Sequence, residues 1–113
     1  MNDSFTAQMT KIDQFAKTRK YERFHTPKNL SMALAVEAAE LMEHYQWLEP
    51  GQDADVFAAQ DEIADVMIYA LRMCSVLGVD PAFAIGLKLG KNEMKHPAGY
   101  GGEIEQWEKP TER

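Results

Sequence analysis

Two strongly apolar helical runs, separated by a proline-glycine break, constrain the fold of this chain more than any other feature. The first run covers residues 30–42, the second covers residues 61–71, and Glu49-Pro50-Gly51 lies between them. Proline and glycine interrupt helices, and a short link makes the two helices that it joins antiparallel neighbours. The sequence therefore predicts a helical hairpin folded about Gly51.

Besides Asp61 at the start of the second run, four carboxylates lie inside these apolar runs. Each run carries two acids three residues apart, which places both on one face of a helix; they are Glu37 and Glu40, then Glu62 and Asp65. Glu40 and Glu62 are each eleven residues from Gly51. Glu37 and Asp65 are each fourteen residues from it. In a hairpin that is symmetric about Gly51, the four acids therefore form one square patch between the helices.

This acidic patch is predicted to bind a divalent cation. Desolvation disfavours the charged form of a carboxylate, so acids in apolar surroundings need compensation. Mg²⁺ prefers oxygen ligands and typically bridges carboxylates to phosphates, and Mn²⁺ is the alternative cation. The competing interpretation is that the acids pair with basic residues or face solvent. The nearest cationic or potentially cationic groups are His44, four residues after Glu40, and Arg72, seven after Asp65, which favours the metal.

Composition excludes several classes of protein. A chain of 113 residues with 45% hydrophobic and 27% charged residues is expected to form one globular domain. No apolar run reaches the roughly 18 residues that span a bilayer, and the N-terminal residues lack the pattern of a signal peptide. The net charge of −6 argues against binding to a nucleic-acid backbone. The single cysteine, Cys74, excludes an internal disulfide and is expected to be a buried thiol in a cytoplasmic protein.

The fold class is predicted to be all-α, with four to five helices. Helical periodicity and cap signals predict helices over residues 4–18, 27–48, 53–77 and 82–95, and no segment alternates as a strand does. Thr26-Pro27 predicts one helix start, and Gly78 predicts the end of the third helix. The helical domain is expected to cover residues 1–97, followed by a tail over residues 98–113. Because the second and third helices are apolar on more than one face, the chain is expected to form a homo-oligomer.

The short sequence motifs around the acids are distinctive. They are Phe24-His25-x-Pro27-x-Asn29-Leu30, Glu37-x-x-Glu40-Leu41, Tyr45-Gln46-Trp47 and Glu62-x-x-Asp65-Val66-x-Ile68-Tyr69. Over residues 20–97 this pattern resembles the MazG-like, all-α NTP pyrophosphatase superfamily. Within this superfamily, the motifs are similar to those of the dCTP pyrophosphatase branch, which includes short MazG proteins of bacterial integron cassettes.

The resemblance implies hydrolysis of a deoxynucleoside triphosphate between the α and β phosphates, and its branch implies dCTP as the substrate. It implies that Mg²⁺ is held by the four acids, that Glu37 or Glu40 accepts the proton of the attacking water, and that the oligomer is a homotetramer. The function would be house-cleaning of the nucleotide pool. Two alternatives stay open: a related pyrophosphatase with another substrate such as dUTP, and a non-catalytic, antitoxin-like helical oligomer.

The resemblance also implies a nucleobase pocket. It places His25, Trp47 and Tyr69 around the base and gives Asn29 a hydrogen bond to the base or sugar. Aromatic stacking on a base contributes about 1–3 kcal/mol, which suits a small pyrimidine. The competing interpretation is that the two aromatic residues belong to the core and that His25 is an ordinary loop residue.

One face of the fourth helix carries basic and polar residues at helical spacing; they are Lys88, Lys91, Asn92 and Lys95. By resemblance this face grips the outer phosphates, whereas the simpler interpretation is a solvated surface. The chain departs from the family pattern at Gly90, Glu93 and His96, so both interpretations stay open. Arg72 is expected to serve either the phosphates or another acid.

Overall fold

The structure is a computed structural model of the chain and describes residues 4–98. Its helices are α1 (Phe5–Thr18), the short 3₁₀ helix η1 (Glu22–Phe24), α2 (Pro27–Glu43), α3 (Val56–Leu77) and α4 (Pro81–Lys95). No strand occurs between residues 4 and 98, so the prediction of an all-α fold is confirmed. The tail predicted over residues 98–113 lies outside the described residues, except for its first residue.

The chain comprises two compact units, one ending at Pro81 and the other beginning at Ala82. The first unit contains α1, η1, α2 and α3, and the second contains nearly all of α4. Each unit is therefore described by itself. The domain boundary expected between residues 97 and 98 stays a prediction.

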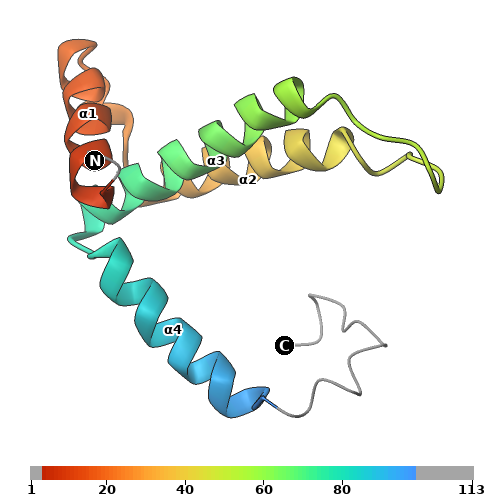
Figure 1. Ribbon diagram of the computed structural model, residues 1–113. Helices are drawn as coiled ribbons and strands as arrows, with labels where there is room; N and C mark the ends of the chain where they lie inside the picture. Colours follow the sequence, from red (N-terminus) through yellow and green to blue (C-terminus); the bar gives the residue numbers. More distant parts are fainter. Residues whose placement is uncertain (1–3, 99–113) are drawn as a thin grey trace. The chain divides into compact units, whose positions relative to one another are not determined.

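The helical hairpin predicted from the sequence is the centre of the first unit. Helices α2 and α3 run antiparallel and pack along their length, and α1 packs against α3 (Figure 1). Leu30 of α2 and Leu71 of α3 are buried, together with the small residues Ala16 and Ala59, which let the helices approach closely. The hairpin thus holds residues from two distant parts of the sequence face to face.

The helix ends follow the cap signals of the sequence. The Thr26 hydroxyl accepts a hydrogen bond from the backbone N–H of Asn29 (3.2 Å), and Pro27 takes the first helical position, as predicted. Asp55 caps α3, so the helix begins at Val56 rather than at residue 53 as predicted. Gly78 ends α3 with φ of +71°, a left-handed conformation that favours glycine.

Helix α2 is shorter than predicted. It ends at Glu43 instead of Leu48, and residues 44–47 form a turn. Hydrogen bonds there shift to the tighter i to i−3 pattern, as from the Tyr45 N–H to the Met42 carbonyl (2.9 Å). The chain must reverse direction between this turn and the start of α3 at Val56, and Pro50 and Gly51 in that segment interrupt helices.

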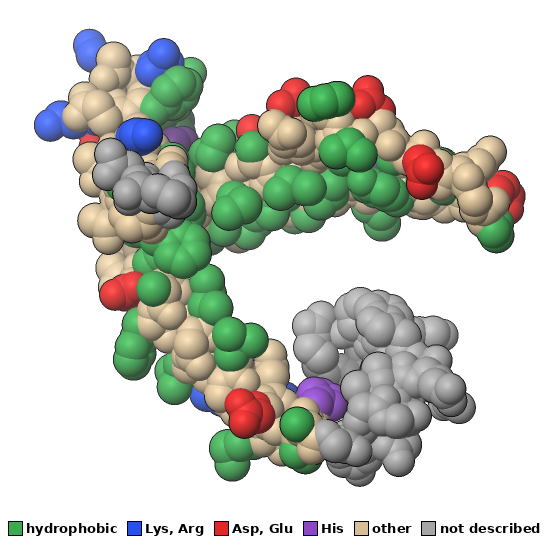
Figure 2. Space-filling model, in the orientation of Figure 1, with side chains coloured by type: hydrophobic (Ala, Val, Ile, Leu, Met, Phe, Trp, Pro, Cys, Tyr) green, Lys and Arg blue, Asp and Glu red, His purple; other side chains and the backbone are tan. Residues whose placement is uncertain are grey.

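The single chain leaves much apolar surface uncovered. Figure 2 shows hydrophobic side chains gathered along the α2–α3 pair. On these helices Val36 is 55% exposed, Met67 is 50% exposed and Phe57 is 79% exposed.

Cys74, predicted to be buried, is only half-buried. Within residues 4–98, no single helix has the length and apolarity to cross a membrane, although α3 and α4 taken together pass on length and composition alone.

Candidate functional site

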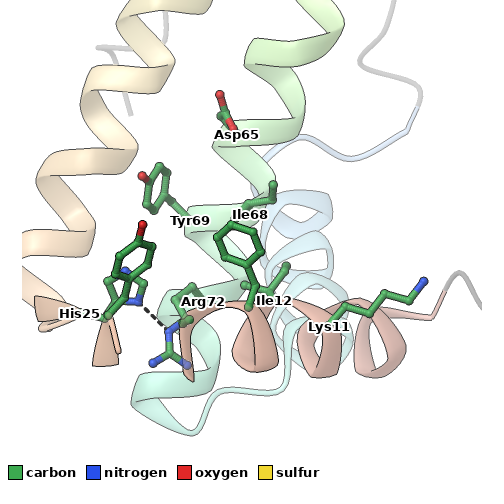
Figure 3. Close-up of a pocket in the computed structure, with 10 residues that line it drawn as sticks. Lys11, Ile12, His25, Asp65, Ile68, Tyr69 and Arg72 are labelled. Carbon is green, nitrogen blue, oxygen red and sulfur yellow. Dashed lines mark hydrogen bonds between the residues drawn. The ribbon is translucent and has the colours of Figure 1, made fainter. Parts of the chain in front are cut away.

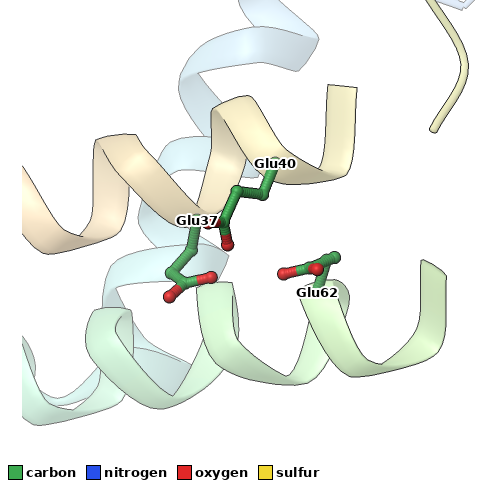
Figure 4. Close-up of side chains that lie close together, drawn as sticks. All are labelled: Glu37, Glu40 and Glu62. Carbon is green, nitrogen blue, oxygen red and sulfur yellow. The ribbon is translucent and has the colours of Figure 1, made fainter. Parts of the chain in front are cut away.

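The hairpin brings three of the four predicted acids together. Glu37 and Glu40 project from α2 toward α3, where Glu62 lies opposite them (Figure 4). One carboxylate oxygen of each residue lies within 4.8 Å of one oxygen of each of the others. Three oxygen donors at this separation form a candidate site for a hard divalent cation.

Asp65, the fourth predicted acid, lies outside this group of three. It follows Glu62 by three residues on α3, and its negative charge contributes to raising the pKa of Glu37. Asp65 also lines a neighbouring cavity. The square patch predicted from symmetry about Gly51 is therefore a triangle of glutamates with the aspartate beside it.

Glu37 is the acid of this cluster whose pKa is shifted. Hydrogen bonding with Glu40, burial, and the negative charges of Glu40 and Asp65 raise the pKa of Glu37 to about 7. Its Oε2 atom is buried and has no hydrogen-bond partner among the described residues. A buried acceptor without a partner is unfavourable, because folding has removed its water and supplied nothing instead. This oxygen therefore fits a ligand that is not part of the chain.

His44 is a potentially cationic group that lies close to the acids. Its Nε2 atom is 3.7 Å from Oε1 of Glu62, and both side chains are partly buried. The distance is long for a hydrogen bond, so the contact provides little compensation for three carboxylates.

A cavity of about 380 Å³ lies beside Asp65, between α1, α3 and the connector that contains η1 (Figure 3). Aromatic rings line much of it, namely Phe15, Tyr21, Tyr69 and the imidazole of His25. Asp65 lines the same cavity, so the acids and the aromatic rings adjoin one another. A flat aromatic ligand with an attached charged group suits such a pair of neighbouring sites.

Hydrogen bonds link two residues that line this cavity, His25 and Arg72, to Asp13 and Ser75. The buried Arg72, 8% exposed, donates from one terminal nitrogen to Oδ1 of Asp13 (2.9 Å). Its Nε donates to Nδ1 of His25 (2.9 Å), and the Ser75 hydroxyl donates to Oδ2 of Asp13 (2.9 Å). Of the two partners expected for Arg72, the structure shows another acid. Asp13 was not among the predicted site residues, and no sequence signal connects it to an arginine 59 residues later.

The residues predicted to surround a nucleobase are divided. His25 and Tyr69 line the cavity. The Asn29 side chain instead donates to the Phe24 carbonyl (2.9 Å) and so braces the connector. Trp47 does not line the cavity and is 82% exposed in the turn after α2, so the interpretation of Trp47 as a core residue is wrong within one chain.

The predicted phosphate-binding residues lie on α4, in the second unit. All four are exposed; they are Lys88, Lys91, Asn92 and Lys95. Because each unit is described by itself, the phosphate contact stays a prediction beside the simpler interpretation of a solvated helix face.

Comparisons with known proteins identify the family. The MazG-like family matches residues 32–109. The chain is 37% identical over 91 residues to dCTP pyrophosphatase 1 of Rattus norvegicus, covering 74% of this chain and 54% of the relative. It is 37% identical over 92 residues to dCTP pyrophosphatase 1 of Homo sapiens, covering 75% of this chain and 54% of the relative. The chain thus spans about half the length of the curated relatives that it matches.

A solved structure shares the fold. The crystal structure of a pyrophosphatase from Archaeoglobus fulgidus matches with a TM-score of 0.72 and 36% sequence identity, over 76% of this chain and 85% of that one. The resemblance drawn from the sequence words is therefore confirmed. The chain belongs to the MazG-like family.

Proposed function

We propose that this chain hydrolyses a deoxynucleoside triphosphate between its α and β phosphates, with dCTP as the preferred substrate. One observation carries the proposal: the three clustered carboxylates and an aromatic cavity are neighbours, because Asp65 lies beside the carboxylates and also lines the cavity. Relatives named dCTP pyrophosphatase 1 support the choice of reaction and substrate. The proposed role is removal of unwanted nucleotides from the cellular pool.

The acids fit Mg²⁺, with Mn²⁺ as a substitute. The donors are all oxygen, and the buried Oε2 of Glu37 has no partner among the described residues. Glu37, Glu40 and Glu62 would hold the cation, with Asp65 beside them. When bound, such a cation polarises a phosphoryl group and neutralises the charge that develops on it.

The chain's own part in the reaction is to orient the substrate and move one proton. Water attacks the α phosphorus, the bond to the bridging oxygen breaks, and pyrophosphate leaves. By family resemblance, Glu37 or Glu40 accepts the proton of the attacking water. Both carboxylates point into the same space between α2 and α3, which supports this role for either one (Figure 4).

The nucleobase is proposed to occupy the cavity beside Asp65. Tyr69 offers a ring for stacking and His25 offers a polar ring edge. Trp47, left exposed by the early end of α2, is available to cover a bound base or to contact a second copy of the chain. Lys88 and Lys91 are the proposed contacts of the outer phosphates, with Asn92 and Lys95 on the same face.

The active form is proposed to be a homotetramer in the cytoplasm. Exposed apolar side chains along α2 and α3 support association, because patches of this kind usually mark interfaces. The net charge of −6 supports a small-molecule substrate over nucleic acid. The single cysteine is consistent with a reducing compartment.

The test is release of pyrophosphate by the purified protein from each of the four common dNTPs and dUTP, with Mg²⁺. Wild type should release pyrophosphate, most rapidly from dCTP. Glu40→Gln should abolish release, whereas Glu43→Gln, on the exposed end of the same helix, should preserve it. Absence of pyrophosphate from every substrate would refute the proposed function.

A further inference from the structure

The contact between Arg72 and His25 determines which nitrogen of the imidazole carries hydrogen. A guanidinium has five N–H donors, no acceptor, and stays protonated in proteins. Arg72 Nε lies 2.9 Å from Nδ1 of His25, as the dashed line in Figure 3 marks. Nδ1 must therefore accept, so the hydrogen of the neutral ring lies on Nε2.

Arg72 is not free to turn away from His25. It is buried, and Asp13 holds its terminal nitrogen at 2.9 Å. The Ser75 hydroxyl in turn holds the other oxygen of Asp13. Burial and the positive charge of Arg72 lower the pKa of His25, which keeps the ring neutral at neutral pH.

The second nitrogen of His25 is the one left for a ligand. Among the described residues, Nε2 has no hydrogen-bond partner. The His25 ring is only partly buried and lines the cavity, so Nε2 is the nitrogen that can meet a ligand. The cavity thus contains a donor that cannot switch to an acceptor while Arg72 stays in place.

We propose that Asp13 and Arg72 are positioning residues that hold His25 as the Nε2–H tautomer, so that the cavity presents a fixed hydrogen-bond donor to N3 of the base. This inference rests on the proposed function, in which the cavity takes the nucleobase. N3 of cytosine accepts a hydrogen bond, whereas N3 of uracil and thymine carries hydrogen; O2 is an acceptor in all three bases and does not distinguish them. A fixed donor that faces N3 therefore favours cytosine over uracil, because a donor facing another donor leaves both unpaired.

The tautomer can be measured without substrate. In ¹⁵N NMR spectra of the full-length protein at neutral pH, His25 should show an unprotonated Nδ1 and a protonated Nε2. The His25 signals are assigned by their loss in His25→Gln. Arg72→Lys keeps the charge but removes the planar fork, so His25 should become a mixture of tautomers. Arg23→Lys is the matched control, because Arg23 stacks on Phe24 and should leave the His25 signals unchanged.

Protonated Nδ1 in the wild type, or an unchanged tautomer in a folded Arg72→Lys protein, would overturn the positioning role. If Arg72→Lys does not fold, Asp13→Asn replaces it, since it preserves shape while releasing Arg72. The wild-type spectrum alone still decides the tautomer.

Base selection is tested with two isosteric substitutions. The amide nitrogen of glutamine in His25→Gln overlays Nε2 and retains the outer donor, whereas asparagine in His25→Asn overlays only Nδ1. His25→Asn should lose the preference for dCTP over dUTP, measured by kcat/KM, by roughly tenfold, the size of one hydrogen bond. His25→Gln should retain most of it.

Equal preference in the two variants would overturn the base-selection role. If the wild type hydrolyses no dNTP, the proposed function fails and base selection fails with it. The NMR result would still decide separately whether Asp13 and Arg72 position His25.

Discussion

Two groups of charged side chains lie between helices. In the first, the carboxylate of Asp13 pairs with Arg72, whereas in the second, the carboxylate of Glu37 lies against other carboxylates. Arg72 and Ser75 satisfy both oxygens of Asp13. By contrast, Oε2 of Glu37 is buried without a partner among the described residues, and the pKa of Glu37 rises to about 7. The first group is complete within the chain and holds Arg72 against His25. The second is incomplete, and its missing partner is the best evidence in the fold for a bound cation.

The largest expected effect is on the incomplete group. Glu40→Gln removes one of the three clustered carboxylates while leaving the helix intact, so dNTP hydrolysis should fall by about 100-fold or more, as for loss of a main electrostatic contributor. Pyrophosphate release measures the effect, and circular dichroism should show unchanged helicity. Activity within a few-fold of wild type would contradict the role assigned to Glu40.

The next effect is on the complete group, and it concerns stability. Asp13→Asn leaves the buried Arg72 without its counter-charge, which should lower the free energy of unfolding by about 2 kcal/mol. Urea denaturation measures it. Asp53→Asn, an exposed position in the connector between α2 and α3, is the control and should change stability by less than about 0.5 kcal/mol. Equal losses of unfolding free energy in the two variants would mean that the pair of Asp13 and Arg72 does not stabilise the fold.

The two groups should also differ in how their stability depends on pH. The pKa of Glu37 is about 7 in the folded protein without metal and near 4.5 when unfolded, so folding favours its protonated form. Its contribution is therefore fully present below pH 4.5 and is lost as the pH rises to about 7. In chelator, wild type should lose stability relative to Glu37→Gln across this range. A constant difference between the two proteins would contradict the raised pKa.

The smallest expected effect on stability is at Trp47. Because its side chain is 82% exposed, Trp47→Ala should change the free energy of unfolding of the single chain by less than about 0.5 kcal/mol. If Trp47 covers the base, KM for dCTP should nevertheless rise. Unchanged KM together with unchanged stability would remove Trp47 from the site.

The comparison also shows where sequence reasoning succeeds. Glu37, Glu40 and Glu62 were found because a helical hairpin has simple symmetry: spacing within each helix and equal distance from Gly51 determine which residues meet. Asp65 follows the same arithmetic but lies beside the triangle, because equal distance from Gly51 places a residue along the helix and does not determine how closely its side-chain atoms approach the others.

Sequence reasoning missed what depends on packing between distant segments. Asp13 and Arg72 meet because α1 packs against α3, and no local pattern encodes that contact. The length of α2 was also overestimated. Its periodicity continues to Leu48, but the helix ends at Glu43, where the backbone hydrogen bonds tighten into a turn ahead of Pro50 and Gly51.

The most direct test of the central claim is a thermal melt with and without Mg²⁺ for three proteins: wild type, Glu40→Gln and Asp13→Asn. If the acids of α2 and α3 bind the cation, Mg²⁺ should raise Tm of the wild type and of Asp13→Asn by the same amount, and should not raise that of Glu40→Gln. The account would be contradicted if Mg²⁺ left the wild type unchanged or stabilised Glu40→Gln equally.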